Sequence, residues 1–369
     1  MTADAELARP AAKSALHTPI CDLFGVEYPI VQTGMGWVSG ARLTSATSAA
    51  GGLGILAAAT MTRDELETAI REVKQRTDKP FGVNLRADQP DIGDRVALLI
   101  REGVRVASFA QAPGERLVKT LVDAGVVTMP TVGARRHAEK VASWGVDAVI
   151  AQGHEGGGHT GSVPTSLLLP QVVDAVDIPV LGAGGFSDGR GLVAALAYGA
   201  AGIAMGTRFL LTRESTVPDG IKGRYLETDV NGTVVTRAID GYPQRVIRTD
   251  VVDRLERSGP FARLFRAVGN ALRFRKLTSA RRRDLMREGL AMHKHQGLTW
   301  SQVAMAANAP MLTRASMVEG RAEVGILPTG QVVGVIDELP TVAELIARIV
   351  ADAEQTLARL RGDARGDTP

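Results

Sequence analysis

The chain of 369 residues lacks several features that define other classes of protein. Its one cysteine, Cys21, excludes an internal disulfide, and a reducing compartment such as the cytoplasm is expected. No segment offers the roughly 18 consecutive apolar residues of a membrane span. Acidic residues number 40 against 43 basic ones, so net charge gives no support to a nucleic-acid partner. Residues 1–17 lack the apolar core of a secretory signal and are predicted, like residues 363–369, to be a disordered tail.

Hydrophobic residues are plentiful while aromatic residues are scarce. Hydrophobic residues make up 45% of the chain and aromatic residues 4%, and glycine occurs 41 times. This composition supports a large core and excludes global disorder. Small residues and tight turns therefore carry much of the predicted architecture.

Short apolar runs alternate with amphipathic stretches over the first two thirds of the chain. Continuous β-branched runs are typical of parallel strands buried on both faces. Helix candidates lie between them, at 62–77, 114–125, 134–145 and 188–199, and Thr62 with Glu65 has the spacing of a capping box. The pattern predicts an α/β fold, a (β/α)8 TIM barrel. The eight predicted strands are 29–33, 53–59, 81–85, 104–109, 126–132, 147–152, 179–183 and 202–206.

An open, doubly wound sheet is the alternative fold. Its dinucleotide fingerprint needs a third glycine after the first strand, and Gly34-Met35-Gly36 lacks it.

The pattern changes after Phe209. Residues 233–249 predict a hairpin around Asp240-Gly241, followed by a basic helical stretch over 250–296 and a further helix from Ser301. A last helix is predicted over 341–361. The expected organisation is a cofactor-binding barrel over 18–210, a helical and hairpin cap inserted after strand 8 over 211–340, and a C-terminal helix over 341–362 that packs on the barrel.

Glycine-rich turns follow the seventh and eighth predicted strands. In a barrel of this kind these two loops form the usual phosphate site. Gly184, Gly185, Gly206 and Thr207 are therefore candidates for phosphate binding, although tight turns alone would also require glycine.

Two histidines follow the sixth strand in the segment QGHEGGGHTG. Histidine takes up a proton near neutral pH, and glycines allow the backbone to approach a planar ligand. We interpret His159 as functional and His154 as a surface residue of the loop. For Trp37 after the first strand and Asn84 in the third, pocket and structural roles both stay open.

Five motifs together resemble the nitronate monooxygenase family of FMN-dependent barrels. They are PIVQTGMGW, FGVNL, EGGGHTG, AGGFSDGRG and MGTRFL. That family also includes flavin-type enoyl-acyl-carrier-protein reductases. The resemblance covers residues 18–209 and resumes at Gly330–Gly334. Gly156 departs from it, since members usually have alanine there.

The resemblance implies a role for each matching residue. His159 corresponds to the catalytic base, and Gln331 would close the site. The flavin would be lined by Gly34, Met35, Gly36, Asn84, Gln152, Gly157 and Gly158, and its phosphate would be held by Gly184, Gly185, Gly206 and Thr207. No metal site is predicted.

The segment LTWSQVAMAANAPML at 298–312 is similar to one branch, found in steroid-degrading bacteria. Those enzymes act on 5-hydroxy-7a-methyl-1-oxo-octahydro-indene-4-carboxyl-CoA. The resemblance implies α,β-dehydrogenation of this hydrindane thioester, with a proton passing to His159 and a hydride to flavin N5. Residues 261–287 hold nine Lys or Arg and one acid, and Arg281, Arg282 and Arg283 are candidates to bind CoA phosphates. A solvated helix face or an oligomer contact explains this stretch equally well.

Several alternatives remain open at this stage. The same barrel residues suit a nitronate monooxygenase that uses oxygen, or a flavin-binding protein without catalysis. An inosine-monophosphate-type dehydrogenase needs a cysteine near the sixth strand, where this chain has none. NAD is a candidate electron acceptor and a homodimer a candidate assembly.

Overall fold

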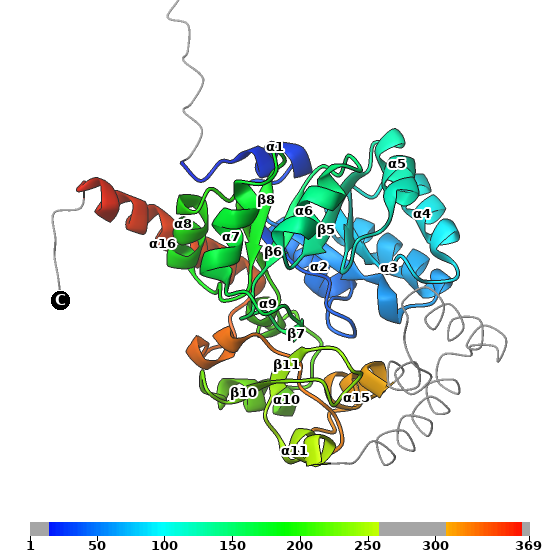
Figure 1. Cartoon of the computed structure of the whole chain (residues 1–369), viewed down its shortest axis with the longest axis vertical. Helices are drawn as coiled ribbons and strands as arrows, with labels where there is room; N and C mark the ends of the chain where they lie inside the picture. Colours follow the sequence, from blue (N-terminus) through cyan, green and yellow to red (C-terminus); the bar gives the residue numbers. More distant parts are fainter. Residues whose placement is uncertain (1–14, 258–307, 364–369) are drawn as a thin grey trace, which may run out of the picture.

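The computed structural model describes residues 15–257 and 308–363, and its central element is a closed barrel of eight parallel strands (Figure 1). Each strand lies within one of the predicted apolar runs, so the barrel prediction is confirmed and the open sheet is wrong. The strands are β1 (Ile30–Gln32), β2 (Leu53–Ala57), β3 (Phe81–Leu85), β4 (Val106–Phe109), β5 (Val127–Val132), β6 (Val149–Gln152), β8 (Val180–Ala183) and β9 (Gly202–Met205). β9 pairs with β1 and closes the barrel, with Val31 opposite Ala204.

Helices cover the outside of the barrel. α3 begins after Thr62, whose side chain accepts from the backbone N–H of Glu65 in a reciprocal capping box, as predicted. Gly125, Gly145 and Gly199 follow helices with φ of +75°, +80° and +86°, a conformation that favours glycine. The outer helices are α2 (Ala41–Ala49), α3 (Arg63–Arg76), α4 (Ile92–Arg101), α5 (Glu115–Asp123), α6 (Arg135–Ala142), α7 (Thr165–Val173) and α8 (Gly189–Ala197), with a 3-10 turn at Ala58–Thr60.

The amino-terminal end of the barrel is filled by α1 (Pro19–Phe24). Ile20 and Phe24 are fully buried in one cluster with strand residues such as Val31 and Leu181. Because this end is packed with apolar side chains, a ligand site is expected at the other end, where the strands finish.

The long helix α16 (Val342–Arg361) lies along α8 (Figure 1). A Cβ at Gly189 would come within 2.2 Å of the backbone nitrogen of Ala353, so only glycine permits this approach. Thr341 and Glu344 form a capping box at its start. The expectation that the last helix packs on the barrel is therefore confirmed.

A second, three-stranded sheet lies beyond the carboxyl ends of the barrel strands. The predicted hairpin is present as β10 (Thr233–Thr236) and β11 (Gln244–Ile247), and β11 also pairs with the two-residue strand β7 (Gly158–His159). Around this sheet lie α9 (Thr207–Leu210), α10 (Asp219–Leu226), α11 (Asp250–Arg257), α15 (Asn308–Met317) and the 3-10 turn η2 (Gln331–Val335) (Figure 1). Most of the predicted basic helical stretch lies outside the described residues.

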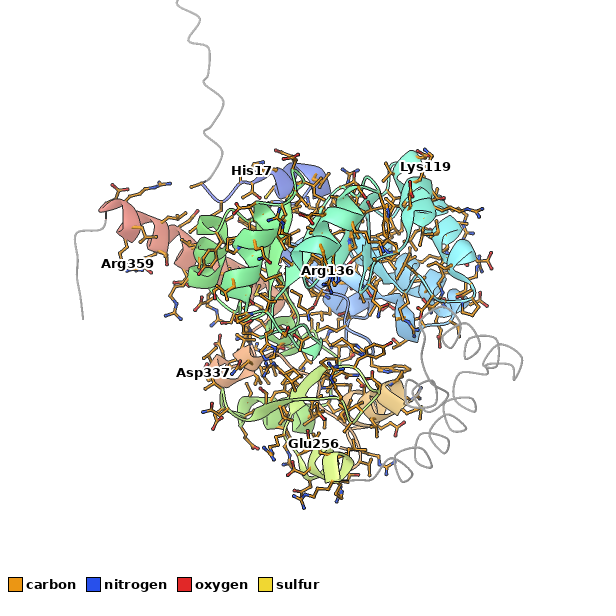
Figure 2. The ribbon with its side chains drawn as sticks, viewed as in Figure 1. His17, Lys119, Arg136, Glu256, Asp337 and Arg359 are labelled. Carbon is orange, nitrogen blue, oxygen red and sulfur yellow. The ribbon has the colours of Figure 1, made fainter. Side chains whose placement is uncertain are left out.

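Charged side chains surround both parts of the molecule. Lys119 and Arg136 project from the barrel helices and Glu256 from α11 (Figure 2). None of the described helices has the length and hydrophobicity that crossing a bilayer requires. Residues 1–14 and 364–369 of the predicted tails lie outside the described residues, and the domain limits at 210 and 340 stay a prediction.

Candidate active site

The structure places the predicted barrel residues at the carboxyl-terminal end of the barrel strands. Each follows a strand or occupies the last part of one, and their loops contact one another. These residues are Gly34, Met35 and Gly36 after β1, Asn84 in β3, Gln152 in β6, Gly157, Gly158 and His159 after β6, Gly184 and Gly185 after β8, and Gly206 and Thr207 after β9.

The loop after β1 lies directly on β3. A Cβ at Gly34 would be 2.3 Å from Cβ of Asn84, so this position must be glycine. Gln32 at the end of β1 is fully buried. Its amide N–H donates to Ser39 Oγ at 2.9 Å, which ties the loop to the strand it follows. Met35 in turn lies beside Gly206, where a Cβ would be 3.4 Å from the Met35 sulfur. The loops after the first and last barrel strands are thus held together.

The loop after β6 packs against the segment that leads into η2. A Cβ at Gly157 would meet the backbone nitrogen of Gly330 at 2.5 Å, and the N–H of Gln331 donates to the carbonyl of Glu155 at 2.9 Å. The Glu155 carboxylate accepts from the backbone N–H and hydroxyl of Thr165, at 2.9 and 2.8 Å, at the start of α7. These contacts hold the loop against the segment before η2 and against the start of α7.

The turn after β8 contains two consecutive glycines in the left-handed region. Gly184 and Gly185 have φ of +96° and +86°, which residues with a Cβ rarely adopt. At the neighbouring strand β9, the hydroxyl of Thr207 accepts from the N–H of Gly330 at 2.8 Å. The phosphate candidates therefore lie on adjacent loops, and phosphate binding by them stays a prediction.

His159 is anchored by residues that the sequence pattern does not connect with it. Its Nε2 lies 2.8 Å from Oδ2 of Asp240, and Nε2 of Gln244 lies 3.1 Å from the same ring nitrogen. The Asp240 side chain is 5% exposed, whereas that of His159 is 61% exposed. The edge of the Tyr242 ring faces the imidazole, with centroids 6.0 Å apart. The imidazole is thus held along one edge and open elsewhere.

Arg245 is a second residue that sequence reasoning has no ground to choose. It is buried, and its guanidinium donates to the carbonyl of His154 at 3.1 Å and to Thr233 Oγ1 at 2.9 Å. Burial lowers the pKa of the Arg245 guanidinium below its usual value, and the charge of Glu155 opposes that shift. Arg245 therefore ties the histidine-bearing loop to the hairpin.

Space for a flat ligand is present beside three of these loops. A Cβ at Gly158 would meet nothing within 4 Å, and at Gly133 and Gly185 it would have only one neighbour, at 4.0 and 3.8 Å. Trp37 has φ of +66°, and its indole N–H is buried without a hydrogen-bond partner among the described residues. Open glycine faces and a buried unpaired donor, all in loops that follow barrel strands, fit a planar heterocycle, so the residues present suit a flavin.

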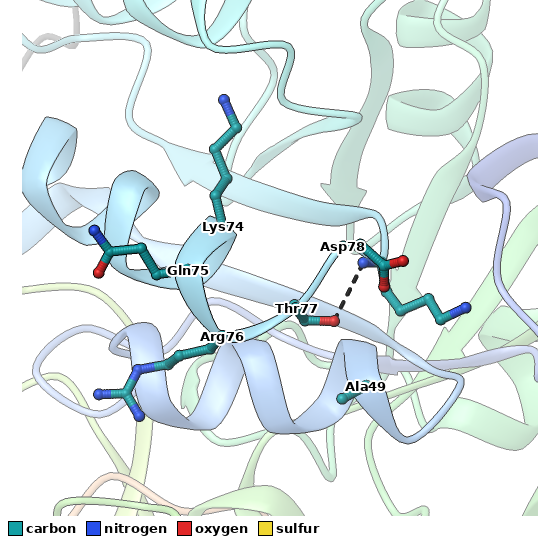
Figure 3. A pocket seen from close by; sticks show the side chains of 7 residues that line it. Ala49, Lys74, Gln75, Arg76, Thr77 and Asp78 are labelled. Atoms are coloured by element: carbon teal, nitrogen blue, oxygen red, sulfur yellow. Dashed lines mark hydrogen bonds between the residues drawn. The ribbon is translucent and has the colours of Figure 1, made fainter.

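The predicted roles of Gln331 and of the three arginines stay predictions. The side-chain amide of Gln331 donates to the carbonyl of Val230 at 3.2 Å. Arg281, Arg282 and Arg283 lie outside the described residues. A cavity of about 400 Å³ lies at the carboxyl end of α3 (Figure 3), lined by Ala49 and residues 74–79. It precedes β3, at the opposite end of the barrel from His159, and takes no part in the site.

Comparison with known proteins identifies relatives that match most of the chain. The model of the family described as nitronate monooxygenase matches residues 17–352. The chain is 61% identical over 342 residues to "(3aS,4S,5R,7aS)-5-hydroxy-7a-methyl-1-oxo-octahydro-1H-indene-4-carboxyl-CoA dehydrogenase" of Mycobacterium tuberculosis, which covers 92% of this chain and 96% of that protein. A protein of the same name from Rhodococcus jostii is 60% identical, with the same coverage.

Solved structures give the same answer for the fold. FabK from Thermotoga maritima is 35% identical to this chain and superimposes with a TM-score of 0.76, over 94% of this chain and 99% of its own. The resemblance inferred from the five motifs is confirmed by these comparisons.

Proposed function

Because the chain belongs to the nitronate monooxygenase family and is an oxidoreductase, we propose that it is an FMN-dependent dehydrogenase of a hydrindane carboxyl-CoA thioester. Such a thioester is a remnant of steroid rings C and D, so the reaction belongs to steroid or cholesterol breakdown. The observation that carries the proposal is an exposed imidazole, anchored by a buried carboxylate, at the open end of the barrel. The 61% identity to a protein named for this activity supports the substrate class.

The proposed chemistry divides between the chain and its cofactor. Bound FMN would supply the acceptor for the hydride that leaves the β-carbon with its two electrons. His159 takes the proton from the weakly acidic α-carbon, so that one C–H bond breaks and one N–H bond forms. The glycine loops after β8 and β9 would hold the cofactor phosphate, and the loops after β1, β3 and β6 would line its ring.

The product distinguishes this reaction from its alternatives. We expect incubation with the hydrindane carboxyl-CoA and an artificial electron acceptor to yield a thioester that is lighter by two hydrogen atoms, measured by mass spectrometry. A nitronate monooxygenase would leave the thioester unchanged and consume oxygen with an alkyl nitronate. A non-catalytic flavin binder would do neither.

We propose that Arg281, Arg282 and Arg283 bind the CoA phosphates. Replacing all three with glutamine is expected to raise the KM for the CoA thioester by about tenfold at low salt, which corresponds to about 1.4 kcal/mol. The difference should shrink as ionic strength rises, because salt screens the attraction between arginine and phosphate. Glutamine at Arg135 and Arg136, on barrel helix α6, is the matched control and should leave KM unchanged. Equal KM values for the triple variant and the wild type at low salt would contradict the assignment.

Three further expectations stay predictions from the sequence. They are NAD as the electron acceptor, a cytoplasmic location and assembly as a homodimer.

A further inference from the structure

We propose that Asp240 is a positioning residue that fixes the protonation pattern of His159, so that Nδ1 is the nitrogen that accepts the substrate proton. The proposal rests on the proposed function for its catalytic meaning, but its structural half can be tested alone. It begins from the 2.8 Å contact between His159 Nε2 and Asp240 Oδ2. A neutral imidazole has one N–H and one lone pair, and a neighbour decides which nitrogen carries the proton.

Asp240 is an acceptor in this contact. Its carboxylate is 5% exposed and receives hydrogen bonds at both oxygens. Oδ1 accepts from the backbone N–H of Tyr242 at 3.1 Å, and Oδ2 accepts from the amide of Gln244. A buried carboxylate persists only with donors around it. A lone pair on His159 Nε2 at 2.8 Å would repel Oδ2, so Nε2 carries the proton and donates it.

Gln244 does not alter this assignment. Its amide nitrogen lies 3.1 Å from His159 Nε2, but both nitrogens are directed at the same Oδ2 of Asp240. Two donors that converge on one acceptor are necessarily close to each other. The 3.1 Å between the two nitrogens therefore follows from their shared acceptor and does not imply a hydrogen bond between them.

This pattern leaves Nδ1 with the free lone pair. When Nδ1 takes the α-proton, the C–H bond breaks, an N–H bond forms and the ring becomes a cation. The Asp240 carboxylate, in contact through Nε2–H, stabilises that charge, in the way a buried aspartate supports a histidine base elsewhere.

The sheet that holds Asp240 also sets the geometry. Asp240 lies in the turn between β10 and β11, and His159 lies opposite Gln244 in the pairing of β7 with β11. The base is thus contributed by the barrel loop and its partner by the hairpin, 81 residues later. Residue spacing alone does not reveal such a pair.

The first test needs no substrate, and it uses a variant only to assign the His159 signal. In the FMN-loaded full chain with ¹⁵N-labelled histidine, ring-nitrogen NMR shifts report which nitrogen is protonated, and six histidines keep the spectrum tractable. The signal missing in His159→Gln identifies the residue. We expect a protonated Nε2 and an unprotonated Nδ1 in neutral His159. The reverse pattern would overturn the proposal, whatever the enzyme acts on.

The second test replaces the carboxylate. In Asp240→Asn the single side-chain oxygen is expected to keep the hydrogen bond from Tyr242 N–H. The amide NH₂ then faces His159 Nε2 as a donor, so the imidazole proton moves to Nδ1. The rate constant for flavin reduction by the CoA thioester should then fall by about 100-fold or more, with a change in KM of less than about threefold. Accompanying the rate change, the NMR signals of His159 should move from the Nε2–H to the Nδ1–H pattern.

Asp229→Asn is the matched control for this substitution. Asp229 accepts from the N–H of Asn231 at 2.7 Å, the same two-residue turn contact that Asp240 makes with Tyr242, but among the described residues no histidine bonds to it. It should preserve both rate and spectrum. A full reduction rate in Asp240→Asn, or an equal loss in Asp229→Asn, would overturn the positioning role. Failure of the wild type to oxidise any CoA thioester would instead remove the proposed function and leave the NMR result standing.

Discussion

Replacing His159 with glutamine is expected to lower the rate constant of flavin reduction by the CoA thioester by about 10²–10⁴-fold, the contribution of a positioned general base. Glutamine cannot take up a proton, but its amide can still donate to Asp240. Because the His159 side chain is 61% exposed, the fold and the bound FMN should be retained. Anaerobic stopped-flow absorbance of the flavin measures the rate, and the FMN-to-protein ratio checks the binding.

His154→Gln is the control within the same loop. The His154 ring contacts the carbonyl of Gly161 at 2.8 Å, whereas Asp240 bonds to His159, Tyr242 and Gln244. We expect a rate close to that of the wild type. If His159→Gln reduced its flavin as fast as the wild type, His159 would not be the base and the non-catalytic interpretation would gain support.

Substituting alanine for Gly184 is expected to release the cofactor. Its φ of +96° is unfavourable for alanine, and the new Cβ would lie 3.0 Å from the backbone nitrogen of Gly156. To relieve this contact the loops after β6 and β8 must separate, and both belong to the proposed flavin site. We expect the Kd for FMN to rise about tenfold or more, equivalent to at least about 1.4 kcal/mol. Fluorescence titration of the apoprotein with FMN measures it.

Gly145→Ala separates backbone strain from loop displacement. Gly145 has φ of +80°, but a Cβ there would meet nothing within 4 Å, and it lies between α6 and the start of β6, away from the carboxyl ends of the strands. This variant should lose about 1 kcal/mol of folding stability and bind FMN normally. Unchanged FMN affinity in Gly184→Ala would show that the turn after β8 does not hold the cofactor.

Much of the fold can be predicted because its signals are local. Buried parallel strands are continuous apolar runs, and the capping box at Thr62 and Glu65 needs only three residues of spacing. The glycines with positive φ at 125, 145 and 199 end helices where the sequence indicates. Each of these features is decided by a few consecutive residues, so one sequence suffices to see it.

The surroundings of His159 depend on contacts distant in the chain, and the sequence does not reveal them. The sequence indicates a turn at Asp240, and the residue does lie in one, since it accepts from Tyr242 N–H. Its second role comes from β7, which has only two residues and shows no strand pattern of its own. Burial of Arg245 is equally invisible, because a charged residue in a hairpin is ordinarily exposed. The sequence shows the Asp240-Gly241 turn itself, and only the structure shows that it faces His159.

Anaerobic titration of the FMN-loaded protein tests the central claim most directly. One cuvette receives the hydrindane carboxyl-CoA and the other an alkyl nitronate, and the flavin absorbance band is followed in both. The account predicts that the CoA thioester bleaches the flavin and that this bleaching is slow in His159→Gln. Bleaching by the nitronate alone would contradict it and assign the chain to the reaction for which its family is named.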